Sequence, residues 1–232
     1  MPFFYYDWTI LIVLPALIFS FWASANVNHT FKKYSRTPIR SGQTAAQAAR
    51  QLLDANGLYN VGILTTKGHL TDHYDPRTKN LYLSESVYNS QSASSVGVAC
   101  HEAGHAIQDA ESYAPLKMRM AIIPACNIGS SLAMPLFFIG LLFAGDFGYL
   151  FMLAGIACFS LATLFQLITL PVEFNASARA LAGMSECNMV SGDELDGARK
   201  VLRAAAMTYV AALATSLLSL LRLLVIANNR RN

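Results

Sequence analysis

Four long segments of the chain are almost free of charged side chains, and they limit its fold more than any other feature. Three contain no charged residue and the fourth contains only Arg222; they are residues 8–28, 120–144, 147–172 and 204–228. A helix of about 20 apolar residues is long enough to cross the ~30 Å hydrocarbon core of a bilayer. Because only helices and closed barrels can span lipid, the sequence predicts a polytopic membrane protein with about four transmembrane helices.

The composition supports this interpretation. Charged residues make up 13% of the chain and hydrophobic residues 54%, whereas a soluble domain carries about 25% charged residues. Lipid covering part of the surface would resolve this shortage of charge. The net charge of +3 is too small to indicate nucleic acid as a partner. The four cysteines form no CxxC pair, so we expect small buried side chains and no disulfide framework.

Basic residues near the first apolar segment predict its orientation. No Lys or Arg precedes residues 8–28, and a basic cluster follows them at Lys32, Lys33, Arg36 and Arg40. The positive-inside rule therefore puts the N-terminus outside and residue 30 onward in the cytoplasm. A cleavable signal peptide needs basic residues before its apolar stretch, so we interpret residues 8–28 as an uncleaved N-terminal anchor.

Residues 120–172 are predicted to form a transmembrane hairpin. Lys117 and Arg119 precede it and Arg179 follows it, while the turn predicted at residues 145–148 holds no basic residue. By the same rule, both ends of the hairpin are cytoplasmic and the turn is outside.

The last apolar segment, residues 204–228, fits the charge rule less well. As a simple span it would place Arg230 and Arg231 outside, and Arg222 lies within it. The segment either crosses the membrane, with Arg222 reaching an interface or facing protein, or lies along the interface. We favour the span.

The remaining segments, residues 29–119 and 173–203, are predicted to be cytoplasmic. The first contains an Ala- and Leu-rich helix over residues 44–56, a small sheet of two or three strands between residues 61 and 84, and a helix over residues 94–110. The second can open a helix at residues 192–196, whose acidic groups suit a first turn. Five segments together are predicted to form one domain of the α+β class that is mostly α. They are residues 8–28, 29–119, 120–172, 173–203 and 204–228.

The sequence His101-Glu102-Ala103-Gly104-His105 lies within the predicted helix over residues 94–110. Histidines at i and i+4 lie one turn apart on one face, so both imidazoles can bind one Zn²⁺. The glutamate between them is placed to take a proton from the metal-bound water. The small residues at 103 and 104 suit a helix packed tightly behind the metal. The alternative is a helix with two incidental histidines.

A catalytic zinc needs a third protein ligand and an open position. His105 is the last histidine in the chain, and Gln108 and Glu111 stand where a metzincin would have Gly and His. The third ligand is therefore a carboxylate or an upstream histidine.

Three downstream carboxylates illustrate the choice. Asp109 is one turn past His105, and Asp146 lies in the turn predicted outside. Glu173 follows the returning span on the side of the HExxH helix, in a helical stretch whose start Pro171 would fix. On spacing alone, Glu173 is equally well explained as a ligand and as an acidic residue favoured at a helix N-terminus.

The segments HEAGHAIQDA, LTDHYDPRTK and PVEFNASARA, followed by GARKVL and MTYVAA, resemble the YugP-like membrane zinc metallopeptidases of bacteria. The likeness covers nearly the whole chain. In this family, and in the broader HtpX-type and prenyl-protein-type membrane endopeptidases, two histidines and a downstream glutamate hold zinc, with a membrane hairpin between them. The resemblance implies His101, His105 and Glu173 as zinc ligands and Glu102 as the general base.

The chain departs from the broader group at one position. That group often has Asp four residues after the ligand Glu, and this chain has Ser177 there. We expect Asn175 or Ser177 to support the ligands instead.

Other contacts with substrate are less closely defined by the sequence. His73, in LTDHYDPR, is predicted to contact the substrate or the transition state from the sheet; the alternative is a turn in which Asp72 and Asp75 bind local backbone. Substrate backbone could add as an extra strand beside residues 81–84. The transition-state stabiliser stays open among Tyr88, Tyr113, Arg179 and Tyr209.

These observations predict a membrane-embedded zinc metalloendopeptidase in the bacterial cell membrane. It would hydrolyse peptide bonds near the cytoplasmic surface by Glu102-assisted attack of zinc-bound water. The substrate would be a peptide or a membrane protein, and a membrane-protein partner or a homo-oligomer stays open. The alternatives are a non-catalytic membrane scaffold with a structural zinc, and a zinc hydrolase acting on another bond. Glu102 argues against the scaffold, because a structural zinc needs no general base.

Overall fold

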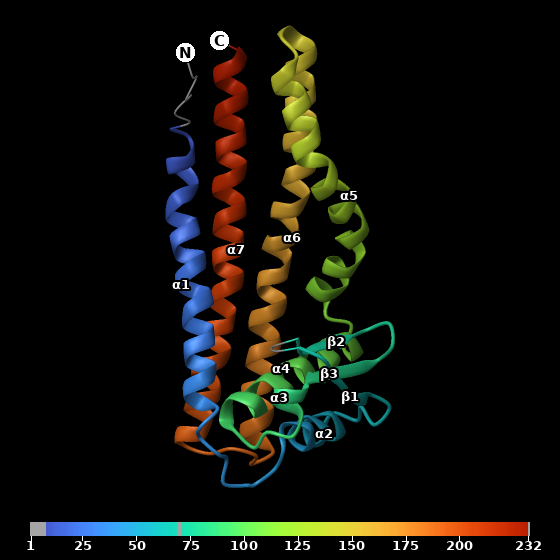
Figure 1. The fold of residues 1–232 in the computed structure, drawn as a ribbon. Coiled ribbons are helices and arrows are strands. Elements are labelled where there is room, and N and C mark those ends of the chain that lie inside the picture. The colour runs from blue at the N-terminus through green and yellow to red at the C-terminus, as the bar shows by residue number, and fades with distance from the viewer. Residues whose placement is uncertain (1–7, 69–70, 232) are drawn as a thin grey trace. The chain divides into compact units, whose positions relative to one another are not determined.

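The structure is a computed structural model that describes residues 8–68 and 71–231. Four of its helices are long and apolar enough to cross a membrane: α1 (Ile10–Tyr34), α5 (Ala114–Leu142), α6 (Gly145–Glu186) and α7 (Asp193–Arg231) (Figure 1). α6 and α7 contain the apolar segments 147–172 and 204–228 in full, and α1 and α5 contain all but two residues of segments 8–28 and 120–144. The predicted class, a mostly α-helical polytopic membrane protein of the α+β type, is confirmed.

The chain divides into two compact units. The first contains residues 8–22, 118–169 and 209–231, which are the apolar parts of the four long helices. The second contains residues 23–68, 71–117 and 170–208, which include the sheet and the shorter helices.

In the first unit, α5 and α6 form an antiparallel hairpin that small residues allow to pack closely. A Cβ added to Gly155 of α6 would lie 2.7 Å from both Ala133 O and Phe137 N of α5. Phe137 and Met152 are fully buried in the same helix pair. Close backbone contact of this kind is how helices associate where lipid removes the hydrophobic driving force.

Hydrogen bonds also join the first helix to the last. Ser20 Oγ lies 3.0 Å from Thr215 Oγ1, and Arg222 Nε donates to Thr9 Oγ1 at 3.0 Å. As the residue number rises along α1 it falls along α7, so the two helices are antiparallel in this unit, and Figure 1 shows them side by side.

Two boundaries differ from the sequence prediction. α6 runs without a break through Pro171, so the prediction that a new helix starts there is wrong. A proline inside a helix removes one donor, and membrane helices tolerate that loss. The turn between the two helices is shorter than predicted, because the predicted turn residues 145–148 already belong to α6. Gly145 (φ 75°) starts this helix, and Asp146 is favoured in its first turn.

The last helix begins where the sequence predicted. α7 carries Asp193, Glu194 and Asp196 in its first turn and continues without interruption through the apolar residues 204–228. The C-terminal segment is therefore the extension of a helix that starts in the second unit.

In the second unit, α2 (Ala45–Ala55) has a capped start and a glycine just after its end. Thr44 Oγ1 accepts from the Gln47 amide, and the Gln47 side chain accepts from the Thr44 amide, which makes a capping box. Gly57 follows the helix with φ 72°, a conformation that glycine adopts without strain.

The sheet has three strands, β1 (Gly62–Thr66), β2 (His73–Asp75) and β3 (Asn80–Ser84), in the order β1-β3-β2. β3 pairs in parallel with β1 and antiparallel with β2. The prediction that substrate could add beside residues 81–84 is wrong in that form, because β3 is the central strand. The two edges of the sheet are β1 and β2.

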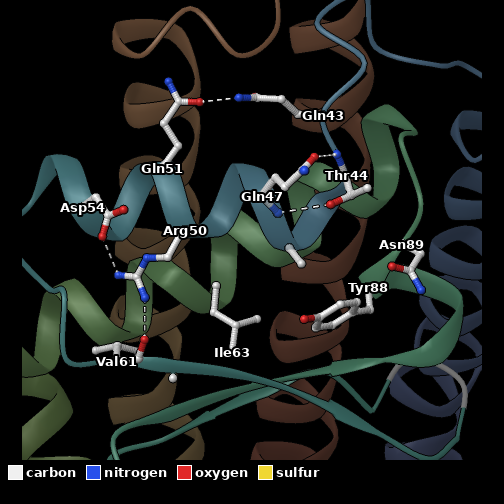
Figure 2. A pocket seen from close by; sticks show the side chains of 12 residues that line it. Gln43, Thr44, Gln47, Arg50, Gln51, Asp54, Val61, Ile63, Tyr88 and Asn89 are labelled. Carbon is white, nitrogen blue, oxygen red and sulfur yellow. Dashed lines mark hydrogen bonds and ion pairs between the residues drawn. The ribbon is translucent and has the colours of Figure 1, made fainter.

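An arginine ties α2 to the chain that enters β1. Arg50 donates at 2.6 Å to the carbonyl oxygens of both Val61 and Leu58, and it pairs with Asp54. Arg50, Asp54 and Val61 line a pocket of about 810 Å³ between α2, β1 and the end of α3 (Glu85–Tyr88) (Figure 2).

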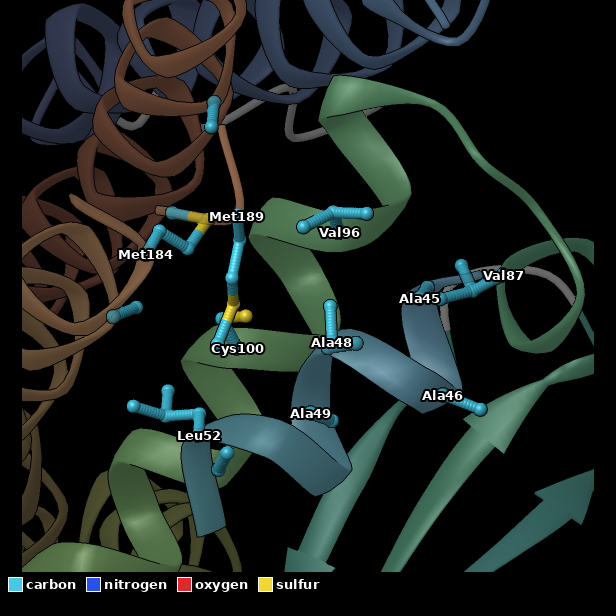
Figure 3. Close-up of a cluster of buried hydrophobic side chains, with 14 of the residues drawn as sticks. Ala45, Ala46, Ala48, Ala49, Leu52, Val87, Val96, Cys100, Met184 and Met189 are labelled. Carbon is cyan, nitrogen blue, oxygen red and sulfur yellow. The ribbon is translucent and has the colours of Figure 1, made fainter. Parts of the chain in front are cut away.

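The core of the second unit lies between α2 and α4 (Ala93–Ala110), as Figure 3 shows. α2 presents alanines at 45, 48 and 49, all fully buried, and α4 presents Val96 and Cys100. Met184 and Met189 cover the same cluster from the C-terminal part of the unit. Small side chains let the two helices approach closely, which fixes the position of α4.

Candidate metal centre

His101 and His105 lie one turn apart on α4, as their spacing predicted. Their ring centroids are 4.8 Å apart and the ring planes meet at 81°. The helix begins at an N-cap, Ser92, whose side chain accepts from the Ser95 amide. The two imidazoles therefore project from a well-formed helix whose start is fixed by sequence.

Glu173 reaches the same point from α6. Its Oε2 lies 3.2 Å from His101 Nε2 and 3.5 Å from His105 Nε2, and the residue is 3% exposed. The ligand atoms of the three residues all lie within 4.8 Å of one another. The structure thus brings together the three side chains that the resemblance implied, from segments 72 residues apart.

The outward nitrogens of both histidines are hydrogen-bonded. His101 Nδ1 lies 3.1 Å from Ser177 Oγ, and His105 Nδ1 lies 3.0 Å from Gln108 Oε1. Ser177 therefore occupies the supporting position where the broader group often has Asp. Both rings are oriented with Nε2 toward Glu173, which is the arrangement that supports metal ligation by histidine.

Gln108 determines which nitrogen of His105 carries the proton. Its amide nitrogen donates to Val172 O at 2.8 Å and to Asn175 Oδ1 at 2.9 Å, so its oxygen must face the imidazole. An amide oxygen only accepts, so Nδ1 of the neutral ring is the donor and Nε2 keeps its lone pair. The lone pair points toward Glu173, and the donor set of two imidazoles and one carboxylate fits Zn²⁺.

Gly104 permits the close approach of the two helices that supply these ligands. A Cβ at this position would lie 2.6 Å from the carbonyl oxygen of Ala176, on α6. Ala176 is fully buried and lies less than one turn after Glu173. The small residue within HExxH therefore sets the distance between α4 and α6.

Glu102 lies next to the three clustered side chains and is held by the sheet. The Tyr74 amide donates to Glu102 Oε2 at 3.1 Å. Burial raises the pKa of Glu102, while positive charge on His101 and His105 would lower it. A carboxylate with one oxygen fixed and an elevated pKa is suited to accept a proton.

The hydrogen bonds of Asp109 are made to Tyr74 and Lys79 and not to the three clustered residues. Asp109 Oδ2 accepts from Tyr74 OH at 2.8 Å and from Lys79 Nζ at 2.5 Å. Burial and then the bond to Asp109 raise the pKa of the Tyr74 hydroxyl well above its usual value. We call Tyr74, Lys79 and Asp109 the β2 latch, because they fasten β2 to α4 next to Glu102.

His73 stands apart from the clustered residues. It is exposed on β2, its ring stacks on Tyr82 with centroids 4.9 Å apart, and its Nδ1 lies 2.8 Å from Thr71 O. Asp75 accepts from the Arg77 amide and from the Thr78 hydroxyl, so it makes the local turn hydrogen bonds predicted as the alternative. Asp72 instead accepts from the amide of Ser84 on β3. A substrate contact by His73 stays a prediction.

Two groups that support the site were not identified from the sequence. In the sequence, Gln108 served only to exclude a metzincin. Its position three residues after His105 on a helix could have indicated that the two side chains are in contact. The backbone amide of Tyr74 could not be identified from the sequence, because nearly any residue at that position would supply the same donor.

Comparison with known proteins agrees with this geometry. A family model described as "Putative neutral zinc metallopeptidase" matches residues 9–228. The chain is 47% identical to the "Putative membrane protease YugP" of Bacillus subtilis (strain 168), over 96% of this chain and 98% of that protein. No solved structure matches. With two imidazoles and a carboxylate gathered at one point, and with a match that spans nearly its full length, the chain belongs to this family of neutral zinc metallopeptidases.

Proposed function

We propose that the protein is a membrane endopeptidase in which His101, His105 and Glu173 hold zinc and Glu102 is the general base. The observation that carries this proposal is the convergence of His101 Nε2, His105 Nε2 and Glu173 Oε2 from two helices. Gln108 and Ser177 hold both rings from behind, and the three-ligand set leaves room for a reacting group.

Zinc in such a site acts as a Lewis acid that makes water a nucleophile near neutral pH and polarises a carbonyl. Glu102 accepts the proton of the attacking water and delivers it to the leaving amine. Tyr74 fixes one oxygen of Glu102 through its amide, so the other oxygen is free to exchange the proton. The β2 latch keeps that amide in place.

We also propose that the site lies on the cytoplasmic side of a bacterial cell membrane and acts on peptide or membrane-protein segments near its surface. The support is the distribution of basic residues around the apolar segments 8–28 and 120–172, whereas segment 204–228, which is followed by Arg230 and Arg231, departs from the charge rule. The four helices that contain these segments are long enough to cross the bilayer.

The experiment compares two carboxylate-to-amide variants of the same helix region. Purified wild-type protein, Glu102→Gln and Glu111→Gln are measured for zinc content by elemental analysis and for cleavage of a membrane-tethered peptide. Glu111 is the control because its carboxylate pairs with Arg179, 2.6 Å away, and not with the three clustered residues.

We expect about one zinc per chain in all three proteins. Loss of a general base lowers turnover roughly 10²–10⁴-fold, so Glu102→Gln should lose activity while Glu111→Gln keeps it. Equal cleavage by wild type and Glu102→Gln, with equal zinc, would leave a zinc-bearing scaffold as the better account.

A further inference from the structure

The first unit contains a pocket that the proposed peptidase chemistry does not use. Its volume is about 520 Å³, and its walls come from α5, α7 and the two residues before α1. α5 contributes four apolar residues from Met134 to Leu141 with the spacing i, i+3, i+4 and i+7. α7 contributes residues from Arg222 to Arg230 with similar spacing, so each helix lines the pocket with one face.

The apolar part of the pocket opens onto the outer surface of the unit. Phe137 and Leu223 are buried, at 1% and 6% exposure, while Trp8 and Phe138 are more than half exposed. Large exposed apolar side chains on helices that span a membrane face the acyl chains of lipid. The pocket is therefore continuous with a surface that lipid covers.

The polar part of the pocket is cationic. Arg222 and Arg230 both line it and lie about 12 Å apart along the helix axis. Arg222 is inside an apolar segment, where a charged residue is unfavourable and usually marks a functional contact. Thr9 accepts from the Nε of Arg222 at 3.0 Å, and both residues line the pocket.

We propose that this pocket binds one anionic phospholipid. Arg222 and Arg230 contact the phosphate, because the fork of guanidinium donors matches phosphate oxygens. Trp8, Phe138 and Leu141 contact the upper part of the acyl chains. None of the described residues that line the pocket is acidic, so none of them would attract the cationic headgroup of a zwitterionic lipid.

The test is a lipid titration of the purified full-length protein, followed by native mass spectrometry. Phosphatidylglycerol and phosphatidylcholine with identical acyl chains are compared on four proteins. Arg222→Gln removes the half-buried charge. Leu141→Trp fills the pocket and keeps both arginines. Arg199→Gln removes an exposed charge of α7 outside the pocket and is the control.

We expect phosphatidylglycerol to bind about tenfold more tightly than phosphatidylcholine, because Arg222 and Arg230 repel the choline cation, whereas the phosphate is common to both lipids. Arg222→Gln and Leu141→Trp should each weaken phosphatidylglycerol binding by about the same factor, while Arg199→Gln should not. Melting temperatures are measured on every variant, and if Arg222→Gln does not fold, Leu141→Trp decides.

Three results would overturn the proposal. The two lipids could bind equally well. Folded Leu141→Trp could keep full phosphatidylglycerol binding. Inorganic phosphate could displace phosphatidylglycerol at equal concentration, which would make the pocket a site for a free anion and not for a lipid.

Discussion

Substitution of Gly104 by alanine should damage the metal centre although position 104 contributes no ligand. The new Cβ would lie 2.6 Å from Ala176 O and 3.3 Å from both Ala176 C and Cα. Carbon atoms pack best at about 3.5–4.0 Å, so α4 and α6 must separate by roughly 1 Å at this point. All the atoms that clash are backbone, so no side-chain rotation can relieve the contact.

The displacement reaches Glu173, because that residue lies less than one turn from Ala176 on the same helix. Metal–ligand distances tolerate only about 0.2 Å, and a 1 Å misplacement can cost about 10²-fold in rate. We therefore expect Gly104→Ala to lower zinc affinity and to reduce turnover about 10²-fold. Overpacking should also lower the free energy of unfolding by about 1–3 kcal/mol.

Zinc affinity is measured by competition with a chelator, turnover on a membrane-tethered peptide, and stability by thermal unfolding. Gly97→Ala is the matched control, since it lies two turns earlier on the same face of α4. Its Cβ would meet the Ala198 methyl at 3.2 Å, on α7 and not on α6. Wild-type zinc affinity in Gly104→Ala, or an equal loss in Gly97→Ala, would show that the contact between position 104 and Ala176 does not position Glu173.

Three further predictions concern the supports of the site and the topology. Gln108→Leu should weaken zinc binding about 10–100-fold, because His105 loses the acceptor for Nδ1; unchanged affinity would show that Gln108 does not orient the ring. Tyr74→Phe should lower turnover about tenfold with zinc retained, because it removes the hydrogen bond to Asp109 in the β2 latch, which is worth about 1.5–3 kcal/mol. Tyr82→Phe is the control. Equal turnover in the two variants would exclude a role for the latch. In a cysteine-free background, a Cys at position 67 should resist labelling from outside intact cells and a Cys at position 147 should react; the opposite pattern would reverse the topology.

The features that the sequence predicts well are those with a local cause. The HExxH helix follows from spacing within a single segment, and its predicted start at residue 94 is one residue from the observed start at Ala93, which Ser92 caps. The four apolar segments are equally local, since each needs only its own length and lack of charge. These signals place His101, Glu102 and His105 on one helix before any tertiary contact is known.

The features that the sequence leaves open depend on contacts between distant segments. Spacing could not choose between Glu173 as a ligand and Glu173 as a helix-start residue, because the answer depends on how α6 packs against Gly104. Pro171 suggested a helix start, and the unbroken α6 removes that explanation for the acid. The central position of β3 was likewise hidden, because strand order does not follow from the strands themselves.

The separation of the ligands along the chain has a consequence for biosynthesis. His101 and Glu173 are 72 residues apart, and a ribosome adds about 5–20 residues per second. For roughly 4–14 s after the first histidine is made, the nascent chain therefore carries only part of its metal site. The apolar residues 120–172 are synthesised in that interval, so the chain becomes competent to hold its metal only after the hairpin segment has been delivered for insertion.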